Sequence, residues 1–303
     1  MIVVYILQSY GGSTLSSEPF SPNDEIRRFF EAQPDRIFTL AQMGEIMRAN
    51  VRDWGPKGPP FDLFLASLLR ETDLRMLKFA FPSRTETRFT WGDRPPFEVV
   101  QSLRRKGHFS HHSAMYLHGL TPEPPQIIYL NVEQQPKPWL ATELTQEAID
   151  IAFKARPRVS NNKARYGNVE ICLLNSMGSG HLGVTKISGP EGEAIRVAGL
   201  ERTLVDITVR PFYSGGACSV LRAYGLAANA LSVGRLAELL TSMEYVYPYH
   251  QAVGFYLERC GRYTEREVDI FRRIPRQSDF YLAHGMTVTE FSNEWRLHYP
   301  KGL

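Results

Sequence analysis

The chain has 303 residues, 43% of them hydrophobic and 22% charged, which is the composition of an ordinary globular protein with room for two domains. The formal net charge of only +3 excludes an overall basic protein, so any contact with nucleic acid must come from a local cluster of Lys and Arg. The cysteines Cys172, Cys218 and Cys260 are odd in number and widely spaced, which predicts reduced, buried thiols in a cytoplasmic protein and no disulfide framework.

Residues 1–20 begin with the apolar run MIVVYILQSYGGS. This run has no basic residues before it and is far too short to span a membrane. We therefore expect a strand-like N-terminal extension and not a signal peptide. No later window reaches the length of a transmembrane helix, so no membrane partner is expected.

Residues 21–73 predict three helices. The first starts at Ser21-Pro22-Asn23-Asp24, with Ser21 as the cap and proline at the first helical position. The second starts with a capping box formed by Thr39 and Gln42. Residues 50–60 are rich in Gly and Pro and predict a loop. The third helix follows, and its apolar residues at helical spacing are Phe61, Phe64, Leu65, Leu68 and Leu69.

Residues 74–91 alternate between apolar and other side chains, which predicts a β-hairpin with its turn at Pro82-Ser83-Arg84-Thr85. Phe79 and Phe89 lie on the apolar sides of their strands, whereas Lys78 and Arg88 point the other way. Three helices followed by a hairpin is the order of a winged helix-turn-helix, whose third helix enters the major groove while the wing lies along the backbone. We therefore expect residues 21–95 to be a DNA-binding domain.

The predicted domain carries cationic side chains in the loop before the third helix, at the end of that helix and on the hairpin, where phosphates would be met. The alternative is an ordinary solvated surface, because acidic residues are interspersed. The third helix offers few base-reading side chains beyond Asp62, Ser67 and Arg70, so phosphate contacts should dominate over sequence readout. The candidate DNA-binding residues are Lys57, Arg70, Arg75, Lys78, Arg84 and Arg88.

Residues 96–303 predict a larger mixed α/β domain with a helical tail, so the expected fold class of the whole chain is α+β. A helix over residues 97–106 should end in the basic turn Arg104-Arg105-Lys106. A short helix over residues 109–120 should follow, capped by Ser110, with Ala114 and Leu117 on its buried face. These two helices are expected to form a packed hinge between the domains.

Four histidines lie in or beside the short helix, which raises the question of a metal site. His111 and His118 are about two helical turns apart, too far to bind one ion without help, and no acidic residue or cysteine accompanies them locally. Packing and capping histidines are the preferred interpretation, so no metal and no cofactor are expected.

The rest of the second domain predicts strands and then helices. The Gly-rich residues 177–180 lack the features of a phosphate-binding loop, so they predict a hairpin turn joining two paired strands. Arg156, Arg158, Lys163 and Arg165 form a basic run that is expected to be a solvated loop, with a second nucleic-acid or partner surface as the alternative. The expected strands are 126–132, 169–174, 182–187 and 193–197, and the expected helices are 142–155, 201–208, 217–229, 233–243, 249–260 and 265–271.

Two segments resemble the AbiEi-type antitoxins of bacterial abortive-infection (type IV toxin-antitoxin) systems. They are SHHSAMYLHGL at residues 110–120 and GLERTLVDI at residues 199–207, with a looser similarity of YPYHQAVGFYLERCG at residues 247–261. In that family an N-terminal winged helix represses the protein's own operon by binding promoter repeats. A C-terminal domain neutralises a nucleotidyltransferase toxin without needing a stable complex with it.

The resemblance implies a phage-defence antitoxin whose partners are operator DNA and a nucleotidyltransferase toxin, with the oligomeric state on DNA left open between monomer and homo-oligomer. It implies operator binding by Lys57, Arg70, Lys78, Arg84 and Arg88. Thr203 and Asp206 would hold the second domain, residues 96–303, together. The alternative is a winged-helix transcriptional regulator or interaction module without a toxin.

No set of residues in the sequence predicts an enzyme. Glu201 and Asp206 are five residues apart on an expected helix, so they face different directions. Cys218 follows two glycines at an expected helix start, but no histidine motif around it completes a nucleophile site, so a small buried thiol is preferred. No catalytic residues are therefore expected, and a nucleic-acid-processing enzyme is the third and least favoured hypothesis.

Overall fold

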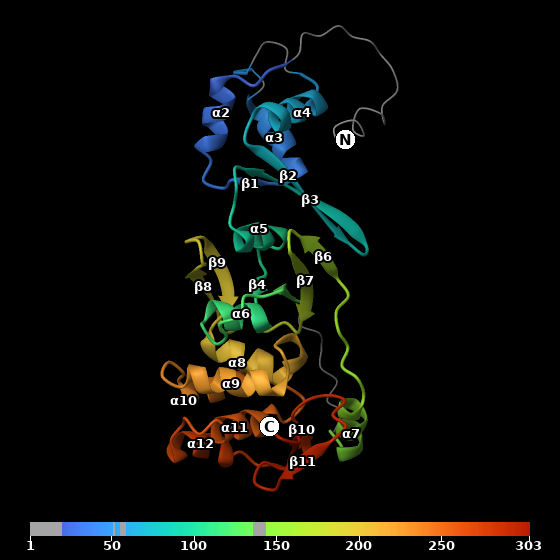
Figure 1. The fold of residues 1–303 in the computed structure, drawn as a ribbon, viewed down its shortest axis with the longest axis vertical. Coiled ribbons are helices and arrows are strands. Elements are labelled where there is room, and N and C mark those ends of the chain that lie inside the picture. The colour runs from blue at the N-terminus through green and yellow to red at the C-terminus, as the bar shows by residue number, and fades with distance from the viewer. Residues whose placement is uncertain (1–19, 51, 55–58, 136–143) are drawn as a thin grey trace. The chain divides into compact units, whose positions relative to one another are not determined.

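The computed structural model describes residues 20–303 except residues 51, 55–58 and 136–143 (Figure 1). The fold is α+β, with helices and, in the described ranges, three sheets. The chain divides into two compact units, residues 1–102 and residues 103–303. The expected strand of the N-terminal extension and Lys57 lie outside the described residues.

The N-terminal unit contains helices followed by a hairpin. Its sheet is antiparallel and has the strand order β1-β3-β2, so the short first strand pairs with the last one. Phe30, Phe64 and Phe89 are fully buried where the helices pack on this sheet. The elements are α2 (Asp24–Glu31), β1 (Ile37–Phe38), α3 (Leu40–Asn50), α4 (Phe61–Glu71), β2 (Leu74–Phe81), β3 (Arg84–Trp91) and α5 (Pro96–Leu103).

The helix starts of this unit follow the predicted capping chemistry with one correction. The predicted cap Ser21 is wrong: Asn23 caps α2, and its Oδ1 accepts a hydrogen bond from the Ile26 amide at 3.0 Å. The capping box before α3 is confirmed, because the Gln42 amide donates to Thr39 Oγ1 at 3.2 Å and the Thr39 amide donates to Gln42 Oε1 at 2.8 Å.

The predicted hairpin is confirmed, but its turn is shorter than expected. Phe81 pairs directly with Arg84, so only Pro82 and Ser83 make the turn. Phe79 and Phe89 are buried as the alternation predicted. Towards the end of β3, however, both faces of the strand are buried, and Arg88 is only 9% exposed.

The C-terminal unit contains a six-stranded mixed sheet with the order β6-β7-β5-β4-β9-β8. The predicted hairpin across residues 177–180 is wrong, because β7 and β8 lie at different places in this order and are not neighbours. Residues 163–166, expected within a loop, form the edge strand β6. The strands are β4 (His108–Phe109), β5 (Ile127–Glu133), β6 (Lys163–Tyr166), β7 (Val169–Ser176), β8 (Val184–Ser188) and β9 (Ala194–Ala198).

Helices make up most of the remaining C-terminal unit, and the five predicted helices after residue 200 are confirmed. A small sheet with the order β10-β12-β11, which the sequence did not predict, completes the unit. The helices are α6 (His111–Leu117), α7 (Gln146–Lys154), α8 (Leu200–Val209), the 3-10 helix η1 (Pro211–Tyr213), α9 (Ala217–Ala227), α10 (Val233–Ser242), α11 (Tyr249–Arg259) and α12 (Glu265–Arg272). The strands are β10 (Phe280–Tyr281), β11 (Thr289–Ser292) and β12 (Leu297–Pro300).

The main core of this unit lies among α8, α9, α11 and the small sheet. Trp295 is fully buried there, and its ring lies against Gly254 of α11. A Cβ atom at Gly254 would come within 2.1 Å of that ring, so the close approach requires glycine. Among the residues that the structure describes, no helix is both long enough and apolar enough to cross a membrane.

Two expectations around the short helix α6 need correction. The preceding helix ends at Leu103, so Arg104, Arg105 and Lys106 lie beyond its last turn. Phe109 belongs to strand β4, and α6 begins only at His111. Leu117, expected to be buried, is half-buried, whereas Met115 is completely buried in the core. The prediction of a buried Ala114 is confirmed, whereas that of a buried Leu117 is wrong.

Candidate functional site

The predicted DNA-binding residues of the N-terminal unit fall into two groups. Lys78 on β2 is exposed and makes no hydrogen bond or ion pair with any described residue. Arg70, Arg75 and Arg84 are also exposed, but each lies beside one carboxylate, respectively Glu71, Asp93 and Glu86. Such surface ion pairs contribute about 0–1 kcal/mol, so these arginines can exchange a carboxylate for a phosphate at little cost.

Arg88 does not belong with the other predicted DNA contacts. Its guanidinium donates to the Ser102 carbonyl, from Nε at 3.4 Å and from Nη2 at 3.2 Å, and Nη2 lies 3.3 Å from Glu86 Oε2. Alternation within β3 correctly placed Arg88 on the side away from Phe89. In the sheet, however, Arg88 pairs with Leu77, so it shares a face with the buried Phe79 and Phe81 of β2. Alternation did not reveal that the end of α5 contacts this side of β3, which buries the side chain away from any phosphate.

The surface of α4 offers little for reading bases. Ser67, a predicted base reader, is buried, and its Oγ donates to the Phe20 carbonyl at 2.8 Å. The exposed side chains include Asp62, Arg70 and Leu63, which is 37% exposed. An acidic and an apolar side chain on this face do not favour a contact with phosphates or with several base edges.

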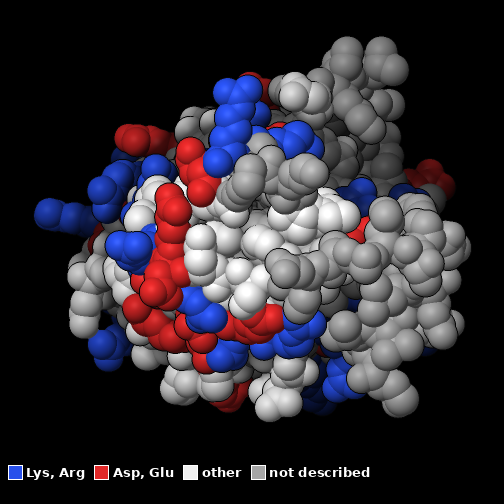
Figure 2. Space-filling model, turned by 90° about the horizontal axis from the view of Figure 1, so that it is seen from above, with Lys and Arg blue, Asp and Glu red and all other residues white. Residues whose placement is uncertain are grey.

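Two exposed arginines that the sequence analysis missed lie at the end of α3 and just beyond it. Arg48 is on the last turn of α3 and Arg52 follows the helix, and neither makes a hydrogen bond or ion pair with a described residue. The signal was present in the sequence as two cations beside the Gly- and Pro-rich loop. Figure 2 shows that acidic and basic side chains alternate over the visible described surface, so this face carries no uniform positive field.

The two segments of the C-terminal unit that resemble antitoxins meet at one backbone carbonyl. His118 Nε2, at the end of α6, lies 2.7 Å from the Ala198 carbonyl oxygen. Thr203 Oγ1 of α8 donates to the same oxygen at 2.9 Å. Gly199 is the N-cap residue of α8, and a Cβ atom there would lie 3.0 Å from the Gly183 carbonyl oxygen. These contacts hold the two segments together.

A buried polar centre surrounds Arg202 of α8, which is only 1% exposed. Its Nε lies 2.8 Å from Asp206 Oδ1, and its Nη1 donates to the Leu182 carbonyl at 2.6 Å. Its Nη2 is 3.5 Å from Glu133 Oε1. Arg202 thus joins α8, the end of β5 and the crossing segment between β7 and β8.

Glu133 anchors that crossing segment. Its carboxylate accepts hydrogen bonds from the Ser179 amide at 2.8 Å, from Ser179 Oγ at 2.6 Å and from the His181 amide at 2.9 Å. Burial would raise the pKa of Glu133, but these hydrogen bonds and the charge of Arg202 lower the pKa to about 2. The carboxylate is therefore ionised and fully engaged at neutral pH.

His108 and His181 lie beside Glu133, and the possible ligand atoms of these three residues are within 4.8 Å of one another. Burial and then the nearby Arg202 lower the pKa of His108 to about 3, so its imidazole is neutral. Neutral imidazoles and a carboxylate are transition-metal ligands. A dication, however, would have to displace the donors that already occupy Glu133 and would lie beside a fixed guanidinium. Glu133 and Arg202 are better explained as a hydrogen-bonded core that fixes the segment between β7 and β8, whereas Nδ1 of His108 and Nδ1 of His181 are buried without a hydrogen-bond partner among the described residues.

The histidines weighed in the sequence as metal ligands make separate contacts. His111 Nδ1 is 2.9 Å from Ser110 Oγ, and His118 bonds to Ala198 as described above. Ser110 is the N-cap residue of α6, but its side chain makes no capping hydrogen bond, which corrects the predicted cap. Both histidines therefore contribute to packing and orientation.

The cysteines depart in part from the expectation of buried thiols. All three are free, but only Cys172 is buried, Cys260 is half-buried and Cys218 is exposed. The prediction of a buried Cys218 is wrong, because this side chain lies on the outer face of α9. Burial raises the pKa of Cys172, which keeps that thiol protonated at neutral pH.

Comparisons with known proteins give a similarity of fold. No protein-family profile matches the chain, and no curated protein matches it. A solved structure described as "Crystal structure of RV2827C protein from Mycobacterium tuberculosis" is similar, with a TM-score of 0.57 and 15% sequence identity over 93% of each chain. An identity this low shows the fold alone, and the two proteins share this α+β fold over nearly their whole lengths.

Proposed function

We propose that the protein is a DNA-binding antitoxin of the AbiEi type, which represses its own operon and counteracts a nucleotidyltransferase toxin. The observation that carries the proposal is the element order of the N-terminal unit, α2-β1-α3-α4-β2-β3, with β1 paired to β3. This is the order of a winged helix-turn-helix. In that arrangement α4 is the helix presented to the major groove and the β2–β3 hairpin is the wing.

The charges of this unit support binding through phosphates more than through bases. Lys78 lies on the wing, while Arg48 and Arg52 lie at the end of α3, and all three are exposed without a described partner. Arg75 and Arg84 have exchangeable surface partners. Because α4 presents few base-reading side chains, the affinity for duplex DNA should be salt-sensitive and its sequence preference modest.

The antitoxin half of the proposal rests on the resemblance of the segments at residues 110–120 and 199–207. Their joint contact at the Ala198 carbonyl supports a structural role for the shared residues. Asp206 is paired with the buried Arg202, which supports the same role. These residues would stabilise the neutralising domain and take no chemical part in neutralisation.

Two cellular assays of the full chain test the proposal. A reporter under the protein's own promoter measures repression, and growth of cells that express a neighbouring nucleotidyltransferase gene measures neutralisation. The triple variant Lys78→Ala, Arg48→Ala and Arg52→Ala should lose repression and keep neutralisation. The matched control replaces three exposed cations of the C-terminal unit, Arg262, Arg266 and Lys301, and should keep repression.

The outcomes separate the proposal from its alternative. Repression without any rescue of growth would favour a winged-helix regulator or interaction module that has no toxin partner. Failure of the wild-type chain to repress or to bind its promoter would contradict DNA binding itself. If the triple variant keeps its fold but loses both repression and neutralisation, the two functions do not reside in separate units.

A further inference from the structure

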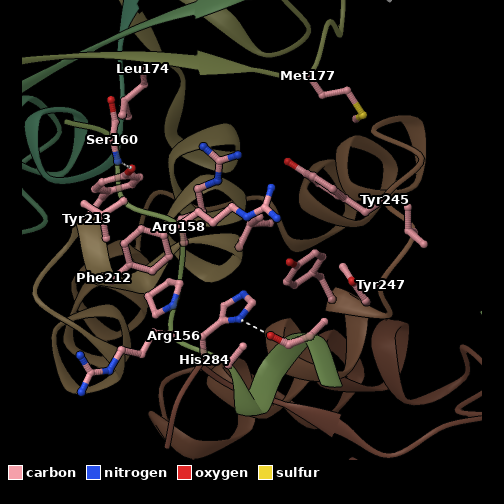
Figure 3. A pocket seen from close by; sticks show the side chains of 18 of the residues that line it. Arg156, Arg158, Ser160, Leu174, Met177, Phe212, Tyr213, Tyr245, Tyr247 and His284 are labelled. Carbon is pink, nitrogen blue, oxygen red and sulfur yellow. Dashed lines mark hydrogen bonds between the residues drawn. The ribbon is translucent and has the colours of Figure 1, made fainter. Parts of the chain in front are cut away.

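A cavity of about 880 Å³ lies within the C-terminal unit (Figure 3). It borders the buried polar centre around Arg202, because Met177, Val209, Arg210 and Tyr245 also line a small pocket with Arg202 and Asp206. The walls of the cavity come from segments far apart in sequence: residues 151–160, the end of β7, residues 209–213, residues 245–249 and His284. This volume is within the range of pockets that bind small organic molecules. The cavity also brings the basic run that includes Arg156 and Arg158 together with the tyrosines Tyr245, Tyr247 and Tyr249.

The charge of the cavity is positive. Arg156, Arg158 and Arg210 line it, and no Asp or Glu is among its lining residues. None of these three guanidinium groups makes a hydrogen bond or an ion pair with another described residue, in contrast to Arg202, which has a full set of partners. Figure 3 shows the guanidinium group of Arg156 directed away from the other labelled side chains, so the positive charge inside the cavity comes from Arg158 and Arg210. Two such guanidinium groups favour an anionic ligand, and planar guanidinium groups suit phosphate oxygens in particular.

The segment that carries Arg156 and Arg158 is held to the rest of the C-terminal unit by hydrogen bonds of Ser160. The Ser160 amide donates to Tyr213 Oη at 2.8 Å, and Ser160 Oγ donates to the Leu173 carbonyl at 3.2 Å. Tyr213 is itself buried. Pro157 stands between Arg156 and Arg158 and restricts the backbone between them. Arg158 is thus presented by a tethered segment, which lowers the entropic cost of holding a ligand.

The cavity also presents apolar and aromatic surface next to the cations. Phe212, Tyr245 and Tyr247 are half-buried in its walls, and Figure 3 shows them with Arg158 among the side chains that line the cavity. Several large apolar side chains at the same cavity are exposed to solvent, and exposed apolar surface of this kind often marks a ligand-binding site. Their exposed fractions are 67% for Ile151, 57% for Val159, 46% for Met177 and 39% for Val246. A ligand with a flat, weakly polar part and an anionic part would satisfy both surfaces.

We propose that this cavity binds a nucleoside phosphate, with Arg158 and Arg210 on the phosphate groups and Phe212, Tyr245 and Tyr247 against the base. Aromatic side chains stack on bases of any sequence, so the site would select for the phosphorylated nucleoside more than for one base. All these residues differ from those proposed to contact DNA. The inference therefore stands independently of the proposed function.

Isothermal titration of the full chain tests this site with three probes: ATP, inorganic pyrophosphate and adenosine. ATP should bind more tightly than either of its parts, because only ATP contacts both surfaces. The double variant Arg158→Gln and Arg210→Gln should weaken ATP and pyrophosphate binding about tenfold or more, since hydrogen bonds to charged groups are the strong ones. Phe212→Leu with Tyr247→Leu should weaken ATP binding and leave pyrophosphate binding unchanged.

The control for the arginine variant is Arg262→Gln with Arg266→Gln, which removes the same charge from exposed positions outside the cavity. It should bind ATP as the wild-type chain does. Thermal melting and promoter-DNA binding are both expected to be unchanged in the arginine variant, which excludes misfolding as the cause of a loss. For the aromatic variant, whose Tyr247 packs on Phe153 and Phe280, retained pyrophosphate binding is the control for folding. Absence of ATP binding to the wild-type chain, or equal binding by the Arg158 and Arg210 variant, would overturn the proposal.

Discussion

The arginines of the two units differ in what surrounds them, although they are the same residue type. Arg75 and Arg84 in the N-terminal unit are more than half exposed, and each lies beside one carboxylate. Arg202 in the C-terminal unit is 1% exposed and is held by Asp206, Glu133, Ser179 and the Leu182 carbonyl. An exposed arginine can exchange its partner for a ligand, whereas a buried one is part of the fold. A count of cations in the sequence cannot separate these two cases.

The largest effect is expected from removing Arg202. Arg202→Ala leaves Glu133 and Asp206 buried without their cation, which should lower the free energy of unfolding by about 3–5 kcal/mol. Denaturant unfolding of the full chain measures this change in the free energy of unfolding. Arg235→Ala is the matched control, because its ion pair with Glu201 is at the surface and should contribute at most about 1 kcal/mol. Equal effects of the two variants would show that the buried centre does not hold the unit together.

The same centre should make stability depend on pH. Burial and the charge of Arg202 lower the pKa of His108 to about 3, so the folded protein binds its proton more weakly than the unfolded chain does. Stability is therefore complete above about pH 6.5 and falls as the pH decreases below it, by about 1.4 kcal/mol per pH unit for one such histidine. Burial lowers the pKa of His111 in the same direction.

Unfolding measured between pH 7 and pH 5 tests this dependence. His108→Gln should remove the contribution of one proton, about 2 kcal/mol over this interval, and leave the part due to His111. Glu133 adds little here, because its pKa changes from the ordinary 4.5 to about 2 and affects stability only at lower pH. An unchanged pH dependence in His108→Gln would contradict the buried neutral imidazole.

Arg88 sharpens the comparison because it is a buried arginine in the N-terminal unit. Arg88→Ala should lower stability by about 1–3 kcal/mol, since the Ser102 carbonyl loses a charged donor. Lys78→Ala on the neighbouring strand should stay within about 0.5 kcal/mol. Thermal melting of both variants distinguishes them. A smaller loss of stability in Arg88→Ala than in Lys78→Ala would contradict the burial of Arg88 and would make it a candidate DNA contact again.

Local sequence patterns predicted most helices and strands, but they did not predict which other elements pack against them. The Thr39 and Gln42 capping box and the helices after residue 200 were found because their signals lie within a few residues. Arg88 was misassigned because alternation gives the side of a strand and not what packs on that side. The strand pairing across residues 177–180 was wrong for a similar reason. The crossing segment is held by Glu133, a residue more than 40 positions away, and no local pattern signals that contact.

The candidate sites likewise divide into features that local sequence patterns predict and features that depend on long-range contacts. The sequence indicated Lys78, Arg75 and Arg84 as surface cations from the hairpin pattern alone. It showed the basic run near Arg158 without any link to the tyrosines near Tyr247. Their meeting in one cavity depends on long-range packing of segments about 90 residues apart. Glu133, His181 and Arg202 were likewise missed as a group, because the chain brings them together from three distant elements.

The claim that the N-terminal unit binds duplex DNA through phosphate contacts is tested most directly by the salt dependence of promoter-DNA binding to the full chain. For about four contacts, a plot of log affinity against log salt should have a slope of about −3.6, and Lys78→Ala should reduce its magnitude by about 0.9. The Arg262→Gln and Arg266→Gln control should keep the wild-type slope. A slope near zero, or an unchanged slope when Lys78, Arg48 and Arg52 are all replaced by Ala, would contradict the claim.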